Sequence, residues 1–506
     1  MVRVRHAVSF NPIWDDTLKW YELAVAEMRK KPVTDKTSWL YQAAIHNTEL
    51  ADNHPGWRTC QHGGWFFFPW HRAYLAGFEA IVRKVIKGLH GPADWSLPYW
   101  NYELPASNAL PPAFRAPKRP DGKDNALFST SRLKYVNNGL GLSQLLQLLG
   151  PTATLSSTKG VHESTFSTGP ANGFGGGPSP SSPFQNSVPS DIESFLHGNV
   201  HVLVGGNAQP FEKSWMSHFE TAAKDPIFWL HHANLDRLWA EWAAKAPHKN
   251  PTANAWLTQV WTFINDSGGT VPKHPSDVVN NITSLDYTYD TLPVAAPHVP
   301  APPGPVGVDA GHNLGVVADD GDDAVAAEQA APDLRLVGAS DAVVLSGGST
   351  TVPVDVDRPT FERANARAAV GAVDALGAPA PRSYLELSGI DAPQVPGVLY
   401  GVYIHPHGTT EAAVADHLVG VISFFGVGNH PKGDDQHDHK LRYVFDVTDA
   451  VDGMNAVGNV GTEGFAVTFR PLDLSALDEE EGLDAAAEPP PPAVPVSIGR
   501  VALLVG

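Results

Sequence analysis

Three stretches within the first 290 residues repeat apolar side chains at spacings of three and four, which is the pattern of an amphipathic helix. The clearest stretch runs from Trp65 to Leu89, where Pro69 lies in the first turns and is tolerated there. A second stretch runs from Asp225 to Trp242, and a looser stripe covers Asp15 to Arg29. We therefore expect a mainly helical N-terminal region.

The pattern changes near residue 334 to short runs rich in β-branched and aromatic residues, separated by Gly, Pro, Asp and Asn. These runs are 342–345, 349–356, 398–404, 418–425, 441–447, 465–469 and 496–505. Residues 291–333 lie between the two regions and are rich in Pro, Ala and Asp, with too few apolar residues to fold. The sequence thus predicts a helical domain (1–290), a linker (291–333) and a C-terminal β-sandwich domain (334–506).

Composition and charge exclude some classes of binding partner. The chain has 506 residues and a formal net charge of −19, so a polyanionic nucleic acid would be repelled. We expect no membrane partner, because no run of about 18 apolar residues occurs. The first ten residues lack the apolar core of a signal peptide, so a cytoplasmic location is the default expectation.

The candidate chemistry lies in two groups of histidines. A lone histidine on an apolar face is usually a satisfied core residue, but several converging buried imidazoles all need partners, and one shared metal provides them. The first group comprises His46, His62 and His71, and the second comprises His197, His201, His231 and His232. Imidazole suits copper, zinc, iron and nickel alike, so at this point a dinuclear zinc hydrolase remains an alternative.

Two long motifs carry a resemblance to a known family. CQHGGWFFFPWHRAYLAGFE (60–79) resembles the first copper-site motif of tyrosinases, catechol oxidases and molluscan haemocyanins, and DPIFWLHHANLDRLWAEW (225–242) resembles the second. LPYWNYE (97–103) and YTY (287–289) are also similar to the family, in which the YTY segment packs near an N-terminal arginine, here Arg3 or Arg5. The chain therefore resembles the type-3 copper polyphenol oxidases, whose fold is a helical bundle around two copper ions.

The resemblance implies a role for each histidine. His46, His62 and His71 would hold the first copper (Cu A), and His197, His201 and His232 the second (Cu B), with His231 as a near neighbour. Asp236 follows His232 by one helical turn and would help to orient it. Molecular oxygen would be the co-substrate.

Cys60 is the sole cysteine, so the chain cannot form an internal disulfide. Cysteine is also a common small core residue, which is the alternative reading. In fungal and molluscan relatives, a cysteine two residues before the second ligand forms a thioether to that histidine. The resemblance therefore implies a Cys60–His62 thioether that fixes the ring.

Three further positions bear on the reaction. Glu193 matches a family glutamate that orients a water near the phenol, although a glutamate at a helix N-terminus is also stabilised by the helix dipole. Many tyrosinases pair it with an asparagine directly after the first Cu B ligand, but this chain has Gly198 there and Val202 after the next ligand. Phe219 matches the gate phenylalanine of plant enzymes, with a core aromatic as the alternative.

The resemblance implies oxidation of o-diphenols to o-quinones with small phenols as substrates. Gly198 leaves ortho-hydroxylation of monophenols open. The C-terminal domain would cover the mouth of the active site and keep the enzyme latent until it is displaced. A haemocyanin-like O2 carrier and the zinc hydrolase are the two alternatives.

Overall fold

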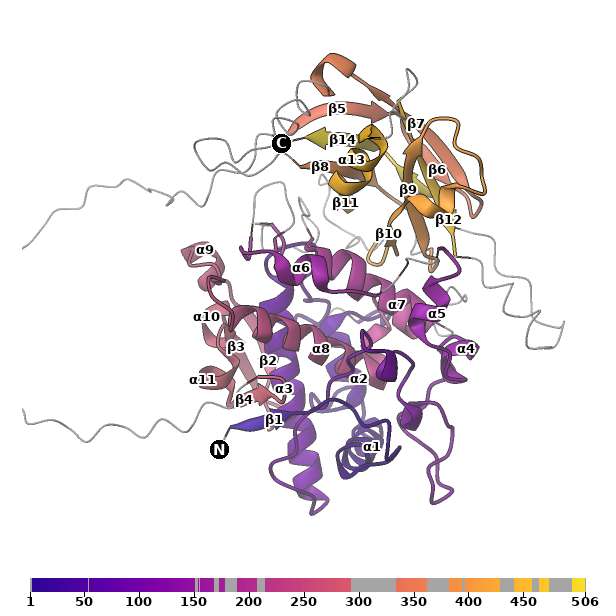
Figure 1. Ribbon diagram of the computed structural model, residues 1–506. Coiled ribbons are helices and arrows are strands. Elements are labelled where there is room, and N and C mark those ends of the chain that lie inside the picture. The colour runs from indigo at the N-terminus through magenta and orange to yellow at the C-terminus, as the bar shows by residue number, and fades with distance from the viewer. Residues whose placement is uncertain are drawn as a thin grey trace, which may run out of the picture.

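The computed structural model places a helical domain beneath a β-rich domain, and the two are in contact (Figure 1). It describes residues 2–292 apart from 53, 151–152, 154, 168–172, 178–188 and 207–213. It also describes residues 334–505 apart from 362–381, 394–395, 428–440, 457–463 and 473–493. Most of the predicted linker, 293–333, lies outside the described residues, as do parts of the Gly- and Pro-rich segment near residue 180.

Three long helices form the frame of the helical domain, as the apolar periodicity predicts. They are α1 (Asp16–Arg29), α3 (Phe67–Gly88) and α8 (Pro226–Ala243). Side chains just before the helices cap two of them: Asp15 accepts from the amide of Leu18, and Asp225 accepts from the amide of Ile227. Helix α3 packs against both α1 and α8, and the apolar faces of all three meet in one core.

Shorter elements complete this domain. The helices are α2 (Trp39–His46), α4 (Lys134–Asn137), α5 (Leu142–Leu146), α6 (Thr158–His162), α7 (Gly198–Gly205), α9 (Asn254–Leu257), α10 (Pro275–Val278) and α11 (Asn281–Leu285), with a π-helical turn η3 (Ile192–His197) before α7. A hairpin pairs β2 (Trp261–Ile264) with β3 (Thr270–Lys273). Strand β1 (Arg3–Arg5) pairs in parallel with β4 (Tyr287–Tyr289), which joins the two ends of the domain.

The C-terminal domain is built on one eight-stranded sheet in the order β10-β9-β12-β7-β5-β14-β8-β11. Its strands are β5 (Arg335–Ser340), β7 (Thr350–Val356), β8 (Ser383–Ile390), β9 (Tyr400–Pro406), β10 (Leu418–Ile422), β11 (Leu441–Asp446), β12 (Phe465–Pro471) and β14 (Arg500–Val505). Two short strands, β6 (Val343–Leu345) and β13 (Val496–Ile498), pair separately, and helix α13 spans Thr448–Ala456.

This sheet curls until its two edges approach each other. A Cβ atom at Gly420 in β10 would lie 2.5 Å from the ring of Phe445 in β11, although these are opposite edge strands. The main sheet of the β-rich domain is thus folded round its own core, where the sequence predicts a sandwich of two sheets. The predicted last strand is also divided, into β13 and β14.

The two domains share apolar contacts at their boundary. Leu399, Val421 and Phe425 belong by sequence to the C-terminal domain but are buried in the core of the helical domain. Tyr403 of β9 donates a hydrogen bond to the carbonyl of Leu149. In Figure 1 the β10 end of the sheet lies next to α7. The domains are therefore packed against each other by buried side chains.

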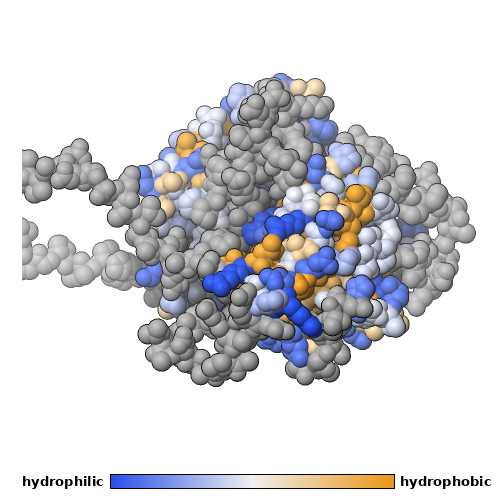
Figure 2. Space-filling view, turned by 90° about the horizontal axis from the view of Figure 1, so that it is seen from above, coloured by the Kyte–Doolittle hydropathy of each residue, from blue (hydrophilic) through white to orange (hydrophobic). Residues whose placement is uncertain are grey.

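The upper face of the C-terminal domain mixes polar and apolar side chains on its described surface (Figure 2). Leu336 and Val344 are the most exposed large hydrophobic residues in the described part of the C-terminal domain. Among the described residues, no helix is both long enough and apolar enough to cross a membrane.

Candidate metal centre

Three histidines from separate segments meet beside α3. His46 ends α2, His62 lies in the segment before α3, and His71 lies in the second turn of α3. Their ring centroids are 5.4 Å (His46–His62), 5.9 Å (His46–His71) and 5.1 Å (His62–His71) apart. One nitrogen of each ring lies within 4.8 Å of the others. The structure thus brings together the whole of the first predicted group.

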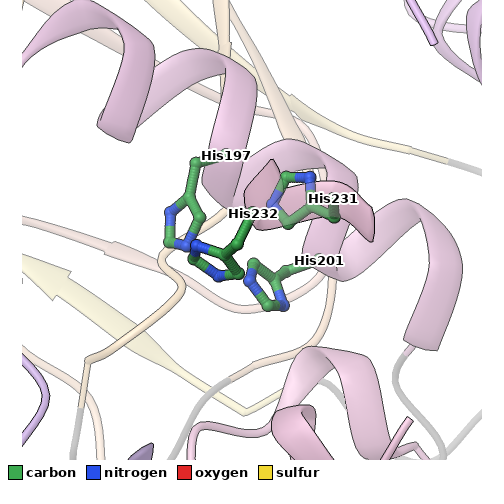
Figure 3. A group of neighbouring side chains, drawn as sticks. All are labelled: His197, His201, His231 and His232. Carbon is green, nitrogen blue, oxygen red and sulfur yellow. The ribbon is translucent and has the colours of Figure 1, made fainter. Parts of the chain in front are cut away.

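Four histidines from two helical segments form the second group. His197 ends the π-helical turn η3, and His201 follows it in α7, while His231 and His232 are neighbours in the middle of α8. One nitrogen of each lies within 4.8 Å of the others, and all four side chains are buried. Figure 3 shows the four rings gathered in the space between these helices.

The two groups adjoin to form one centre. The ring of His71 stacks on that of His232, with centroids 4.3 Å apart and planes 6° from parallel. The ring of His62 lies 5.4 Å from that of His197. A pair of metal ions held by the two groups would therefore be neighbours in one buried pocket.

The adjacent histidines of α8, His231 and His232, have different neighbours. His232 lies against His71 of the first group and 6.4 Å from His46. His231 instead lies nearly parallel to His197 at 5.4 Å and packs on Tyr102. This placement supports His232 as the ligand directed toward the first group and His231 as its neighbour.

In three of these histidines, a hydrogen bond to a main-chain carbonyl determines which ring nitrogen is free to bind a metal. Nδ1 is hydrogen-bonded to a carbonyl oxygen in three rings: His46 to Phe219 (3.2 Å), His71 to Phe67 (2.8 Å) and His201 to Met216 (2.7 Å). Because a carbonyl only accepts, Nδ1 carries the proton and Nε2 keeps its lone pair. Within the described residues these three Nε2 atoms are buried without a hydrogen-bond partner. Such atoms are expected to have a partner, and a metal ion fits that need.

Burial also keeps the imidazoles neutral. It lowers the pKa of His71 and of His201 to about 3, against the opposing effect of their carbonyl hydrogen bonds. Burial and the neighbouring histidines together lower the pKa of His46, His197 and His232 well below the ordinary value. Neutral imidazole is the form that binds metal, so the protein holds the ligands ready at neutral pH.

Glu193 lies in the π-helical turn and lines a pocket together with His62 and His197. Its Oε1 accepts a 2.6 Å hydrogen bond from the amide of Gly63. Burial raises the pKa of Glu193 to about 8, although hydrogen bonds from the amides of Gly63 and Gly64 oppose the shift. The structure therefore places the predicted carboxyl group beside both histidine groups.

The two positions that directly follow His197 and His201 have structural roles. A Cβ atom at Gly198 would lie 2.5 Å from Oγ of Ser423, so the close approach of the C-terminal domain requires glycine here. Val202 is buried in α7, and its carbonyl accepts from the amide of Gly206 at the helix end.

Asp236 forms its hydrogen bonds with residues other than His232. Its carboxylate accepts from Arg72 (2.5 Å), Arg5 (3.1 Å), Tyr287 (2.5 Å) and Tyr289 (2.5 Å). These four partners occupy both oxygens, so Asp236 ties α8 to α3 and to the β1–β4 ladder, and it does not orient His232 by a direct bond. Arg5, whose guanidinium lies 3.7 Å from the ring of Tyr287, is the N-terminal arginine beside the YTY segment.

Phe219 and Cys60 both lie close to the first group. The ring of Phe219 is 4.9 Å from that of His46 and 4.7 Å from that of His62, a position consistent with the predicted gate. Cys60 is buried, and burial raises the pKa of its thiol well above the ordinary value. The thioether to His62 stays a prediction.

Phe425 is the site residue that sequence reasoning missed. It belongs to the C-terminal domain, yet its ring stacks on His201 with centroids 4.1 Å apart and planes 12° from parallel. It also lies 5.4 Å from the ring of His197 and 5.8 Å from that of Phe219. Nothing local marks Phe425, because its partners are more than 200 positions away in the chain.

Comparison with known proteins agrees with this geometry. Residues 36–245 match the family model described as the common central domain of tyrosinase, and residues 333–504 match a domain of unknown function, DUF7868. Tyrosinase HcTyr1 of Hahella sp. (strain CCB-MM4) is 28% identical over 521 residues, which cover 97% of each chain. The latent chloroplastic polyphenol oxidase of Prunus armeniaca is 27% identical over 323 residues, covering 58% of this chain and 50% of that protein.

Solved structures show the same fold. Latent apple tyrosinase superposes with a TM-score of 0.59 at 21% identity, covering 100% of this chain and 97% of that one. The tyrosinase of Burkholderia thailandensis gives a TM-score of 0.52 at 19% identity, covering 98% and 100%. Both likenesses extend over the helical and the C-terminal parts together.

Proposed function

We propose that this chain is a type-3 copper polyphenol oxidase that oxidises o-diphenols to o-quinones with O2 at a dinuclear copper site, since residues 36–245 match the central domain of tyrosinase and its relatives are tyrosinases and polyphenol oxidases. The observation that carries the proposal is the meeting of two buried histidine groups in one pocket. His46, His62 and His71 would hold one copper, and His197, His201 and His232 the other.

The donor set fits copper. Imidazole nitrogen is a good ligand for copper, and neither group requires a carboxylate to complete a trio. Copper, when bound, supplies the redox chemistry that passes electrons from the phenol to O2. The protein contributes fixed rings, since main-chain carbonyls hold Nδ1 of His46, His71 and His201.

Glu193 is our candidate for handling the phenol proton. It lines the pocket next to His62 and His197, and the amide of Gly63 fixes one carboxylate oxygen. Its other oxygen, Oε2, has no hydrogen-bond partner within the described residues. In the ionised form of Glu193, which prevails above its raised pKa of about 8, that oxygen can accept the proton of an incoming phenol, directly or through a water.

Phe425 supports the proposal that the full chain is latent. Its ring covers His201 on the side where Phe219 also lies, so an aromatic substrate would compete with it for the same surface. We propose that the C-terminal domain closes the site until it is displaced. The same closure is the observation that favours an O2-binding protein as the second candidate, because O2 is far smaller than a phenol.

The deciding experiment measures quinone formation from a catechol by copper-loaded protein, before and after cleavage within residues 293–333. We expect two copper ions per chain and a rise in quinone formation after cleavage and dilution. Two bound copper ions without quinone in either form would favour the O2-binding candidate. Binding of zinc but not of copper would favour a hydrolase and contradict both. Tyrosine and tyramine assayed in parallel would test hydroxylation of monophenols, which Gly198 leaves open.

A further inference from the structure

One short segment before α7 contacts the metal pocket on one side and the C-terminal domain on the other. Toward the pocket it places Glu193 and His197, both buried. Between them, Phe195 turns the other way and is packed with the core of the C-terminal domain. Its ring lies 4.8 Å from that of Phe445 and 6.0 Å from that of Tyr443, both in β11.

The two residues after His197 also contact the C-terminal domain. Asn199 donates a 3.1 Å hydrogen bond from its side chain to the carbonyl of Val421 in β10. Gly198 lets Ser423 approach so closely that no Cβ could be accommodated without movement. Residues 195, 198 and 199 therefore all contact the C-terminal domain, and His197 lies among them.

The contacts of Phe195 bear on the metal pocket because of the backbone conformation of this segment. Residues 192–197 form a π-helical turn, which is rare and is often found at functional sites. Phe195 is only two residues from both Glu193 and His197, so a shift of its backbone moves both groups. Loss of the packing around Phe195 would leave an apolar side chain in water and remove a restraint on the turn.

We propose that Phe195 is a positioning residue of the Cu B half of the site, held by Phe445 and Tyr443. The C-terminal domain is then a support of the metal centre as well as its cover. This inference rests on the proposed function, because it concerns copper held by His197. It also predicts that displacing the domain uncovers the site at the expense of copper retention.

The test uses the full chain with Phe195→Ala, Phe195→Leu and Phe445→Ala. Copper per chain is measured after dialysis against a weak chelator, and electron paramagnetic resonance detects isolated Cu(II), since a coupled Cu(II) pair gives no signal. We expect roughly tenfold or greater weakening of Cu B binding in Phe195→Ala, the scale seen when groups behind a metal ligand are removed. A signal of isolated Cu(II) should appear, and Phe195→Leu should restore most of the paired copper.

Two controls separate support from other effects. Phe361→Ala removes a ring packed on Phe465 in the C-terminal core, without touching η3, and should keep both copper ions. Phe424→Ala removes a ring that packs on Tyr400 inside the C-terminal domain while leaving Phe195 in place, and should also keep both. Phe445→Ala should reproduce Phe195→Ala, and the double variant should add little to either.

Some outcomes would overturn the proposal. If Phe195→Ala keeps two coupled copper ions and only oxidises catechol faster, Phe195 holds the C-terminal domain over the pocket but does not position the metal site. If Phe361→Ala loses copper as readily, general loosening of the C-terminal domain is the cause. Failure of the unaltered chain to bind copper would contradict the proposed function itself, and that result is distinguishable from either of these.

Discussion

At the scale of single residues, the chemistry of the site depends on which nitrogen each histidine offers. Carbonyls of Phe219, Phe67 and Met216 hold Nδ1 of three rings and leave Nε2 for metal. A sequence pattern finds the histidines but does not give the carbonyl partners, because these depend on the path of the main chain. The histidines that meet in the site could thus be predicted from motif resemblance, whereas their tautomers could not.

The adjacent histidines of α8 provide a matched pair of variants. We expect His232→Ala to lose one copper ion per chain, because this ring faces the first group. His231→Ala should keep both ions, since its ring packs on His197 and Tyr102. Metal analysis of the two purified proteins decides between them, and the opposite result would exchange the two roles.

Cys60 provides a second test at this scale. If the thioether to His62 forms, the intact mass of the chain falls by the two hydrogens lost from the thiol and the ring, and denatured protein does not react with thiol reagents. Cys60→Ser should abolish the mass deficit, because serine cannot form the thioether. A freely alkylated Cys60 in copper-loaded protein would show that it is only a buried core residue.

At the scale of elements, buried ion pairs hold the frame together. Asp236 of α8 joins Arg72 of α3 and Arg5 of β1, and the side chains of all three are almost fully buried. Removing one partner of such a cluster leaves charge uncompensated in the interior. The sequence shows these residues in separate motifs, and only the fold shows that they form one cluster.

We expect Asp236→Asn to lower the free energy of unfolding by about 3–5 kcal/mol, because Arg5 and Arg72 lose their counter-charge. Tyr287→Phe, which removes a single hydrogen bond to the same carboxylate, should cost less, about 1.5–3 kcal/mol. Chemical denaturation at neutral pH measures both. Equal effects would contradict the charge argument.

The pH dependence of stability gives a further check on Asp236. Burial alone would raise its pKa, but Arg72 and Arg5 outweigh burial, so the pKa lies below the ordinary value. Its contribution is therefore present above the unfolded pKa of roughly 4 and is lost as pH falls through the folded pKa. Asp236→Asn should lose less stability than the unaltered chain over that acidic range.

Local signals explain which elements could be predicted. Helices α1, α3 and α8 have long apolar stripes, and two of them have Asp caps, so their bounds agree with the sequence within two or three residues. Strand β8 was missed because Glu386 interrupts its apolar run, and the structure pairs Glu386 with Arg442 at 2.5 Å. A polar residue that is paired across strands cannot be distinguished from a loop residue by pattern alone.

At the scale of the whole molecule, the site is completed by two domains that are distant in the chain. Phe425 and Phe424 are neighbours in sequence, but Phe425 stacks on His201 while the ring of Phe424 packs on Tyr400 inside the C-terminal domain. These two residues offer a matched comparison between loss of the cover and loss of domain stability.

We expect Phe425→Ala to raise catechol oxidation by the uncleaved chain at least tenfold, because the surface over His201 becomes free. Phe424→Ala should lower the unfolding free energy of the C-terminal domain by about 3–5 kcal/mol, with a smaller rise in oxidation. Initial rates of quinone formation and thermal unfolding are measured for both. Equal activation at unequal stability would contradict a specific role for Phe425.

Residues 293–333 connect the C-terminal domain to the helical domain whose metal pocket it closes. This connection sets the effective molarity of the C-terminal domain at the pocket. While the chain is whole, closure is unimolecular, so latency should not depend on protein concentration. After a single cut in this connection, the two halves are a bimolecular complex held only by contacts such as Tyr403–Leu149 and Phe195–Phe445. Dilution into buffer that contains copper should then switch the cleaved enzyme on, and mixing in excess C-terminal fragment should switch it off again.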